Sequence, residues 1–180
     1  MSEVLPETVS KHRAEAPKTL NFAIITCSTS RYKEYVETGK LNDPSGDLIV
    51  RVLKESGHRV TMRKIVNDDR EDIQRAVMRA LKSRKVDVII TSGGTGISPR
   101  DVTIEAIQPL LEKELPGFGE IFRAISYREI GSAAVLTRSI AGIARGKAIF
   151  CLPGSPHSAL LALKEIILPE AAHIIKHARE

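Results

Sequence analysis

The sequence contains no tryptophan, and only 4% of its residues are aromatic. The core must therefore be built from Ile, Val, Leu and Ala, a set that suits a parallel sheet covered by helices on both faces. Two cysteines in 180 residues, Cys27 and Cys151, provide no disulfide framework, and both lie in apolar runs where buried, inert thiols are expected. No stretch approaches about 18 consecutive apolar residues, and no apolar leader opens the chain, so we expect a cytoplasmic protein without membrane contact.

The chain carries a net charge of +5. A basic surface favours nucleic acid, an anionic membrane or small anionic substrates as partners. Lys and Arg are nevertheless mixed with Asp and Glu, as in the segment 63–72, and no basic run is interleaved with aromatic residues that would stack on bases. We therefore expect no nucleic-acid partner. A solvated surface and the attraction of phosphate-bearing substrates both remain as interpretations.

The chain divides at one point only. Residues 1–18 are polar, contain Pro6 and Pro17 and show no sustained periodicity, which predicts a flexible N-terminal extension. No internal repeat and no break in composition follows, so we expect one domain over residues 19–180.

Short apolar runs alternate with helical periodicity along this domain. We predict strands over 21–26, 59–66, 86–90 and 148–152, and helices over 47–55, 73–81, 104–111, 119–129 and 158–177. Asp43 or Ser45 can cap the first helix, and Gly57 can end it. The alternation predicts a three-layer α/β/α fold with a mostly parallel central sheet, in which ligands bind at the carboxyl ends of the strands.

Two loops rich in glycine and proline follow predicted strands, namely Thr91–Asp101 and Leu152–Pro156. If their strands are neighbours in the sheet, both loops line one crevice. Glycines let a ligand approach the backbone closely, and successive amides in such turns form a concavity that holds anions. The first loop has neither the ending of a Walker A motif nor the position of a dinucleotide-binding motif. A tight strand-to-helix connection is the alternative. The candidate ligand-binding residues of this loop are Thr91, Ser92, Gly93, Gly94, Thr95 and Gly96.

Two carboxylates accompany the glycine loop. Asp101 lies where the loop meets the next helix, and Asp68 follows the second strand. Either can serve as a helix N-cap or belong to an acidic turn. A carboxylate beside an anion-binding loop is unfavourable unless Mg²⁺ lies between the two, so the second interpretation is a metal site that includes Asp101 and Asp68.

Three ordered segments resemble the signature of the molybdopterin-binding family, which includes the MogA and MoaB proteins and the G domain of gephyrin. They read Thr-Ser-Gly-Gly-Thr-Gly-Ile-Ser-Pro-Arg-Asp-Val-Thr over 91–103, Pro-Gly-Phe-Gly-Glu-Ile-Phe-Arg over 116–123, and Leu-Pro-Gly-Ser-Pro over 152–156. The resemblance extends over about residues 21–177 and is strongest to MoaB. It implies the molybdopterin-binding fold and an Mg²⁺- and ATP-dependent adenylylation of molybdopterin, which releases pyrophosphate. It also implies a homo-oligomer, trimer or hexamer, and hand-over to a protein that inserts molybdenum or tungsten.

The resemblance assigns roles to residues of this chain. The two key carboxylates of the family match Asp68 and Asp101, and its glycine loop matches the segment 92–96. Its second loop matches Pro153, Gly154 and Ser155. The chain departs from the family at residues 28–31, where Ser-Thr-Ser-Arg replaces a Ser-Asp-Arg turn, and at His157, where adenylylating relatives often have Lys.

Two other functions remain as alternatives. A carrier would hold or deliver molybdopterin without chemistry, but it has little use for two carboxylates near an anionic ligand. A metal-insertion enzyme of the MoeA branch usually contains this fold within a much longer chain than 180 residues. No Ser-His-Asp or Cys-His arrangement is discernible.

Overall fold

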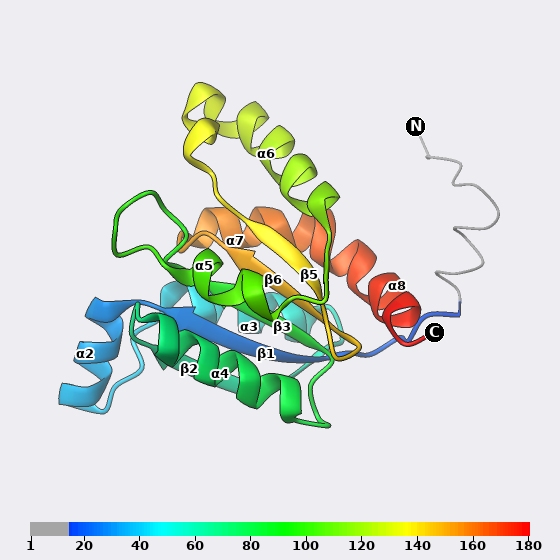
Figure 1. Ribbon diagram of the computed structural model, residues 1–180, viewed down its shortest axis with the longest axis horizontal. Coiled ribbons are helices and arrows are strands. Elements are labelled where there is room, and N and C mark those ends of the chain that lie inside the picture. The colour runs from blue at the N-terminus through cyan, green and yellow to red at the C-terminus, as the bar shows by residue number, and fades with distance from the viewer. Residues whose placement is uncertain (1–14) are drawn as a thin grey trace.

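The computed structural model describes residues 15–180 (Figure 1). Its centre is a six-stranded sheet with the strand order β2-β1-β3-β6-β5-β4. The first four strands in this order are parallel, whereas β5 pairs antiparallel with β6, and β4 pairs antiparallel with β5. The strands are β1 (Asn21–Cys27), β2 (Arg59–Val66), β3 (Val88–Ser92), β4 (Lys113–Glu114), β5 (Ile140–Ala144) and β6 (Lys147–Leu152).

Helices cover both faces of the sheet, which confirms the predicted three-layer α/β/α fold (Figure 1). One face packs against α3 (Pro44–Glu55), α7 (Pro156–Ala162), α8 (Leu168–Ala178) and the start of α6 (Pro116–Ile130). The other face packs against α4 (Arg70–Lys82) and α5 (Thr103–Ile107). Ile and Val fill the central strands, and the cores on both faces contain mostly aliphatic side chains, as the scarcity of aromatic residues requires.

Most predicted elements are confirmed. The strand over 59–66 has the predicted bounds. Asp43 caps α3 as predicted, because its Oδ1 accepts from the N–H of Gly46 (3.0 Å). The third strand begins two residues later than predicted and extends to Ser92, because β6 pairs with it as far as that residue. Cys27 and Cys151 are both buried free thiols.

Three helical predictions are wrong in detail, and proline explains two of them. The helix expected to reach residue 111 ends at Ile107 and continues as a 3₁₀ turn, Gln108–Leu110, that contains Pro109. The single closing helix is interrupted by a π-turn, Leu163–Ile167, because Pro169 has no N–H for the carbonyl one turn before it. The chain also forms a helix that was not predicted, α2 (Thr29–Thr38), which has no buried residue.

The buried Lys147 and the partly buried Asp87 form hydrogen bonds that connect the strands with neighbouring segments. Lys147, on β6, is buried, and its ammonium donates to the carbonyls of Ala80, Ser83 and Val86 at the end of α4. Asp87 accepts from the backbone and side-chain nitrogens of Asn21 (both 2.8 Å) at the start of β1. The C-terminal end of α4 is therefore held against the sheet by a side chain from a strand that lies far away in sequence.

Residues 1–14 of the predicted extension lie outside the described residues. Glu15 accepts a hydrogen bond from the ammonium of Lys176 on α8, at the edge of the described part. The boundary at residue 18 stays a prediction. Among the described residues, no helix is both long enough and apolar enough to span a bilayer.

Candidate active site

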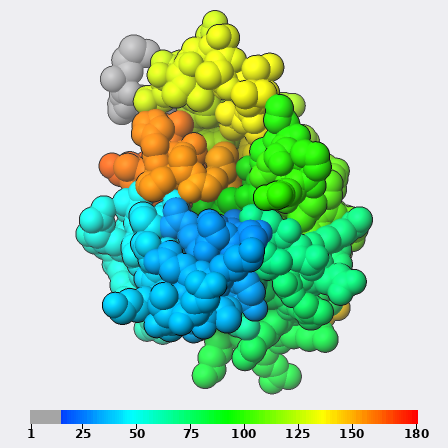
Figure 2. Space-filling model, turned by 90° about the vertical axis from the view of Figure 1, so that its left-hand side faces the viewer, coloured from blue at the N-terminus to red at the C-terminus, as the bar shows by residue number. Residues whose placement is uncertain are grey.

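The two glycine- and proline-containing loops lie side by side at the carboxyl ends of β3 and β6. The N–H of Gly93 donates to the carbonyl of Leu152 (3.0 Å), and the hydroxyl of Ser92 donates to the carbonyl of Pro153 (3.3 Å). A Cβ built on Gly154 would lie 3.2 Å from Cα of Gly93. Because β3 and β6 are neighbours, the expected common crevice exists. Figure 2 shows this face, where the green glycine loop, the orange start of α7 and the blue residues around α2 meet.

Two hollows meet at this contact and share Gly93, Gly94 and Gly154. The first, about 300 Å³, also contains Asp101 and Arg138; we name it the Asp101 side. The second, about 290 Å³, also contains Asp68 and Arg31; we name it the Asp68 side. Together they form a polar groove with the glycine loop as its ridge, and each side has one of the two predicted carboxylates.

Gly94 lies so close to the carboxylate of Asp68 that no other residue fits. Its φ is +62°, in the left-handed region, and a Cβ there would lie 2.4 Å from Thr103 Oγ1 and 2.6 Å from Asp68 Oδ1. The carbonyl of Gly94 accepts from the N–H of Thr103 (2.9 Å), which ties the loop to the start of α5. Loop backbone, hydroxyl and carboxylate are thus packed in direct contact.

Asp68 is held by one oxygen and leaves the other unpaired. Its Oδ2 accepts from the N–H of Thr29 (3.1 Å), whereas its buried Oδ1 has no hydrogen-bond partner among the described residues. Burial raises the pKa of Asp68, hydrogen bonds from Thr29 lower it, and the charge of Asp101 raises it again, so that its pKa lies above the ordinary value. A buried carboxylate oxygen without a donor is unfavourable unless a cation or proton reaches it.

Asp101 is not the helix cap that its position suggested. Residue Val102 is the N-cap of α5 and makes no side-chain capping bond. Instead, Asp101 Oδ2 accepts from the N–H of Ser98 (2.9 Å) and closes the glycine loop on itself. A Cβ built on Gly96 would lie 2.8 Å from the same oxygen, so the carboxylate faces the loop backbone.

Two arginines complete the groove and were not identified from the sequence. Arg138 donates to the carbonyl of Gly96 (2.7 Å) and pairs with Glu105 on the Asp101 side. Arg31 donates to the carbonyl of Asn42 (3.2 Å) on the Asp68 side. Each half of the groove therefore places one cation near one carboxylate. This arrangement can hold an anion and a metal ion together.

The buried carboxylate of Asp43 helps to position the residues of the Asp68 side. Asp43 accepts from the hydroxyl of Thr26 (2.7 Å) and from Arg63 (3.3 Å), and Arg31 Nη1 lies 3.8 Å from its Oδ1. The next helical turn also contributes, because the hydroxyl of Ser45 donates to the carbonyl of Gly154 (2.7 Å). The start of α3 thus positions both Arg31 and the second loop.

The structure brings most of the predicted site residues to the groove, but not all of them. Thr91 lies on the opposite side of the strand, where its hydroxyl is buried beside the thiol of Cys151. Ser155 lines neither hollow and caps α7 by accepting from the N–H of Ser158 (3.1 Å). His157 is exposed and pairs with Glu129 (3.6 Å). The predicted residues that line the groove are Asp68, Ser92, Gly93, Gly94, Thr95, Gly96, Asp101, Pro153 and Gly154.

The donor set suits a hard divalent cation that is shared with a ligand. No group of three or more His, Cys, Asp or Glu side chains converges on one point within residues 15–180. Mg²⁺ needs no such group, because it commonly takes one or two carboxylates and completes its octahedron with water and substrate phosphates. The unpartnered oxygen of Asp68 and the neighbouring charge of Asp101 therefore fit Mg²⁺.

Comparisons with a family model, with known sequences and with solved structures all identify the same family. Residues 23–173 match a family described as a probable molybdopterin binding domain. The chain is 48% identical to molybdenum cofactor biosynthesis protein B of Bacillus cereus, over 93% of this chain and 95% of that protein. It is 49% identical to the molybdopterin adenylyltransferase of Pyrococcus furiosus, over 96% and 99%. The crystal structure of the tungsten cofactor synthesizing protein MoaB from Pyrococcus furiosus superposes with a TM-score of 0.82 at 48% identity, over 92% of this chain and all of that chain.

Proposed function

Because this chain belongs to the family of molybdopterin-binding domains, we propose that it transfers an adenylyl group from ATP to molybdopterin. A terminal phosphate oxygen of molybdopterin attacks the α-phosphorus of ATP. The new phosphorus–oxygen bond forms as the bond from that phosphorus to the β-phosphate oxygen breaks. Adenylyl-molybdopterin and pyrophosphate are the products, so the chain takes part in molybdenum or tungsten cofactor synthesis in the cytoplasm.

The observation that carries this proposal is the pair of carboxylates on either side of the glycine loop. In a protein that only carried an anionic pterin, Asp68 and Asp101 would weaken binding of the pterin, since like charges repel. In a nucleotidyl transfer they serve a purpose, because Mg²⁺ held by them would neutralise charge on the reacting phosphates. The buried, unpartnered Oδ1 of Asp68 is the strongest single sign of such a cation.

The protein's own part is alignment and charge neutralisation. The amides of Gly94 and Gly96 would hold phosphate oxygens on the ridge of the groove, and the hydroxyl of Thr95 would add a hydrogen bond. Gly93 and Ser92 would position the loop, because their donors are bound to the carbonyls of Leu152 and Pro153. Arg138 and Arg31 would stabilise the charge that develops as pyrophosphate leaves. No covalent intermediate with the protein is needed, because both reacting groups are phosphates.

The direct test is the purified chain with molybdopterin, ATP and Mg²⁺, followed by release of pyrophosphate. We expect pyrophosphate only when all three are present, and none after removal of Mg²⁺ by a chelator. Tight binding of the pterin without any pyrophosphate at saturating ATP would support a carrier and contradict the proposal.

Asp101→Asn separates the catalytic role of this residue from its structural one. The amide oxygen of Asn can still accept from the N–H of Ser98, so the loop keeps its shape and the melting temperature barely moves. Turnover should fall by about two to three orders of magnitude, the usual scale for the loss of one electrostatic stabiliser. Asp69→Asn is the matched control, because Asp69 is an exposed cap of α4 and Asn is an equally good cap. Near-normal turnover of Asp101→Asn at limiting Mg²⁺ would remove Asp101 from the active site.

We further propose that the chain forms a homo-oligomer, a trimer or a hexamer, and hands its product to a metal-insertion protein. Helix α6 projects from the sheet (Figure 1), and the region around its end exposes several large apolar side chains. These are Ile121, Tyr127, Ile130, Val135 and Leu136. Exposed apolar surface of this kind is commonly covered by a second subunit. Light scattering at micromolar concentration should give three or six times the mass of one chain; a monomer would contradict it.

A further inference from the structure

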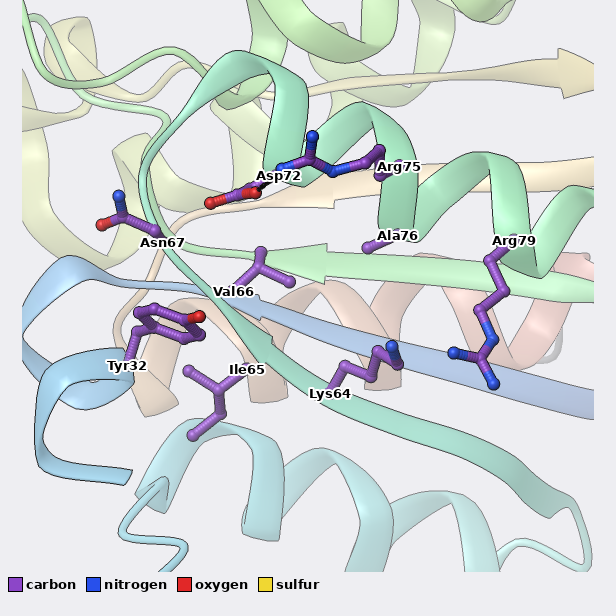
Figure 3. A pocket seen from close by; sticks show the side chains of 9 residues that line it. All are labelled: Tyr32, Lys64, Ile65, Val66, Asn67, Asp72, Arg75, Ala76 and Arg79. Carbon is purple, nitrogen blue, oxygen red and sulfur yellow. Dashed lines mark hydrogen bonds and ion pairs between the residues drawn. The ribbon is translucent and has the colours of Figure 1, made fainter. Parts of the chain in front are cut away.

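A second pocket lies outside the groove, along the free edge of β2. It has a volume of about 340 Å³ and lies between β2, α4 and the first turn of α2. Figure 3 shows Lys64 and Arg79 at one end of the pocket and Tyr32 and Asn67 at the other, with Val66 and Ala76 between them. Within residues 15–180, strand β2 pairs with β1 alone, so its outer edge is open to this space.

One end of this pocket has positive charge that the protein does not neutralise. Lys64 is half-buried, yet no carboxylate pairs with Lys64 or Arg79 anywhere in residues 15–180. The remaining cation of the pocket, Arg75, is bound to Asp72. Lys64 and Arg79 can therefore both meet an anion that enters the pocket.

Arg63, the residue before Lys64 on β2, does have carboxylate partners. Successive side chains of a strand point to opposite faces, and Arg63 meets Asp43 (3.3 Å) and Asp47 (2.7 Å) on the α3 face. Lys64 meets no acid on the α4 face. The charge at Lys64 is therefore available for a ligand.

The other end of the pocket is polar and aromatic. The ring of Tyr32 lies at this end, and Asn67 also contributes to the lining. The Oδ1 atom of Asn67 is buried, and its amide points away from the other side chains of the pocket, so a ligand in the pocket meets the tyrosine ring and not this oxygen. Asn67 lies three positions after Lys64, just beyond the end of β2, which corresponds to about 10 Å along an extended chain. A planar ring at this end of the pocket would pack against the ring of Tyr32.

We propose that this pocket binds a small organic phosphate with a planar heterocycle, with its phosphate on Lys64 and Arg79 and its ring against Tyr32. An acidic peptide paired with the edge of β2 is less well matched, because such a peptide needs cations along the strand, whereas here they gather at one end. The site is separate from the groove, although Asn67 directly precedes Asp68. Its occupant therefore lies one peptide unit from a groove carboxylate.

The test is a titration of the isotope-labelled full chain with AMP, followed by the backbone amide signals of residues 64–67. We expect these signals to move and saturate. Lys64→Met and Arg79→Met should each weaken AMP binding at these signals by about tenfold, the scale of one charge-assisted hydrogen bond. Lys85→Met, which removes an exposed cation outside the pocket, is the control and should change nothing. Signals from Gly94 and Gly96 report on AMP in the groove, so the two sites are distinguished.

Further probes test each half of the proposed ligand. Inorganic phosphate should move the same signals with an affinity about tenfold lower than AMP, because it has no ring, and Tyr32→Leu should reduce that difference. The proposal is overturned if AMP leaves residues 64–67 unmoved, or if Lys64→Met, Arg79→Met and Lys85→Met bind AMP equally. A Glu-rich peptide that moves these signals where AMP does not would overturn it in favour of a protein partner.

Discussion

The close contact at Gly94 gives a quantitative test of the groove. Gly94 has φ +62°, and Gly39, at the end of α2, has nearly the same conformation with φ +67°. A Cβ on Gly39 would meet no atom within 4 Å, whereas one on Gly94 would lie 2.4 Å from Thr103 Oγ1. The two glycines therefore share the backbone strain of an alanine substitution and differ in its steric effect.

The expected magnitudes follow from these distances. An alanine in the left-handed region costs about 1–2 kcal/mol, which in a domain of this size lowers the melting temperature by about 2–8 °C. Gly39→Ala should show this loss and keep full turnover. In Gly94→Ala, ordinary contact at about 3.4 Å requires Thr103 or Asp68 to retreat by about 1 Å. A misplacement of that size at a catalytic group costs about 100-fold in rate.

The assay combines thermal unfolding with the rate of pyrophosphate release for both variants. Gly94→Ala should be the less stable of the two and slower by about two orders of magnitude. If Gly94→Ala retains turnover within about threefold of Gly39→Ala, then the contact between the loop and Asp68 does not matter for catalysis, and the proposed geometry of the site is wrong.

Two further predictions concern buried charges. The pKa of Asp68 is raised in the folded protein, so the stability that it contributes is present at pH values below the unfolded value of 3.8 and is lost as the pH rises through the folded pKa. Asp68→Asn should therefore raise the melting temperature at pH 7 more than at pH 3 while it lowers turnover; calorimetry that shows the same difference at both pH values would contradict this. Lys147→Met leaves three carbonyls at the end of α4 without their donor and should cost about 2–3 kcal/mol in urea unfolding. A loss below about 0.5 kcal/mol, the range of surface substitutions such as Lys85→Met, would show that water replaces the ammonium.

The parts of the fold that follow from local pattern could be predicted from the sequence. Strands β1, β3 and β6 are mostly apolar runs, β2 mixes apolar with charged residues between two predicted helices, and α3 and α4 bury one regular stripe of side chains. By contrast, α2 buries no residue and so has no apolar period to detect. Strand β4 was missed because it has only two residues. Strand β5 was missed because Gly142 interrupts its apolar pattern; a glycine is required there, since a Cβ would collide with the carbonyl of Lys113.

The candidate site divides in the same way. The glycine loop is contiguous in sequence, Asp68 follows a recognisable strand, and Asp101 ends the loop before the next helix, so residues 68 and 92–101 could be identified from their pattern. Arg31 and Arg138 could not, since each reaches the groove through an element that has little sequence signal, α2 in one case and the segment before β5 in the other. Capping of the next helix, which was the alternative interpretation of Asp101, does not occur because the loop turns back on this residue before α5 begins.

The contact between Gly93 and the loop after β6 determines when the site can form as the chain folds during translation. The strands that meet there are separated by more than fifty residues, and β6 ends at Leu152 in a chain of 180. A growing chain can pair β1 with β2 and β3 early, but its glycine loop has no opposite wall until Pro153 and Gly154 have left the ribosome. Such late, non-local pairing is slow relative to helix formation. The nascent chain can therefore pack α4 against β1, β2 and β3 before its nucleotide groove exists, and chains interrupted before residue 153 would be partly folded and inert.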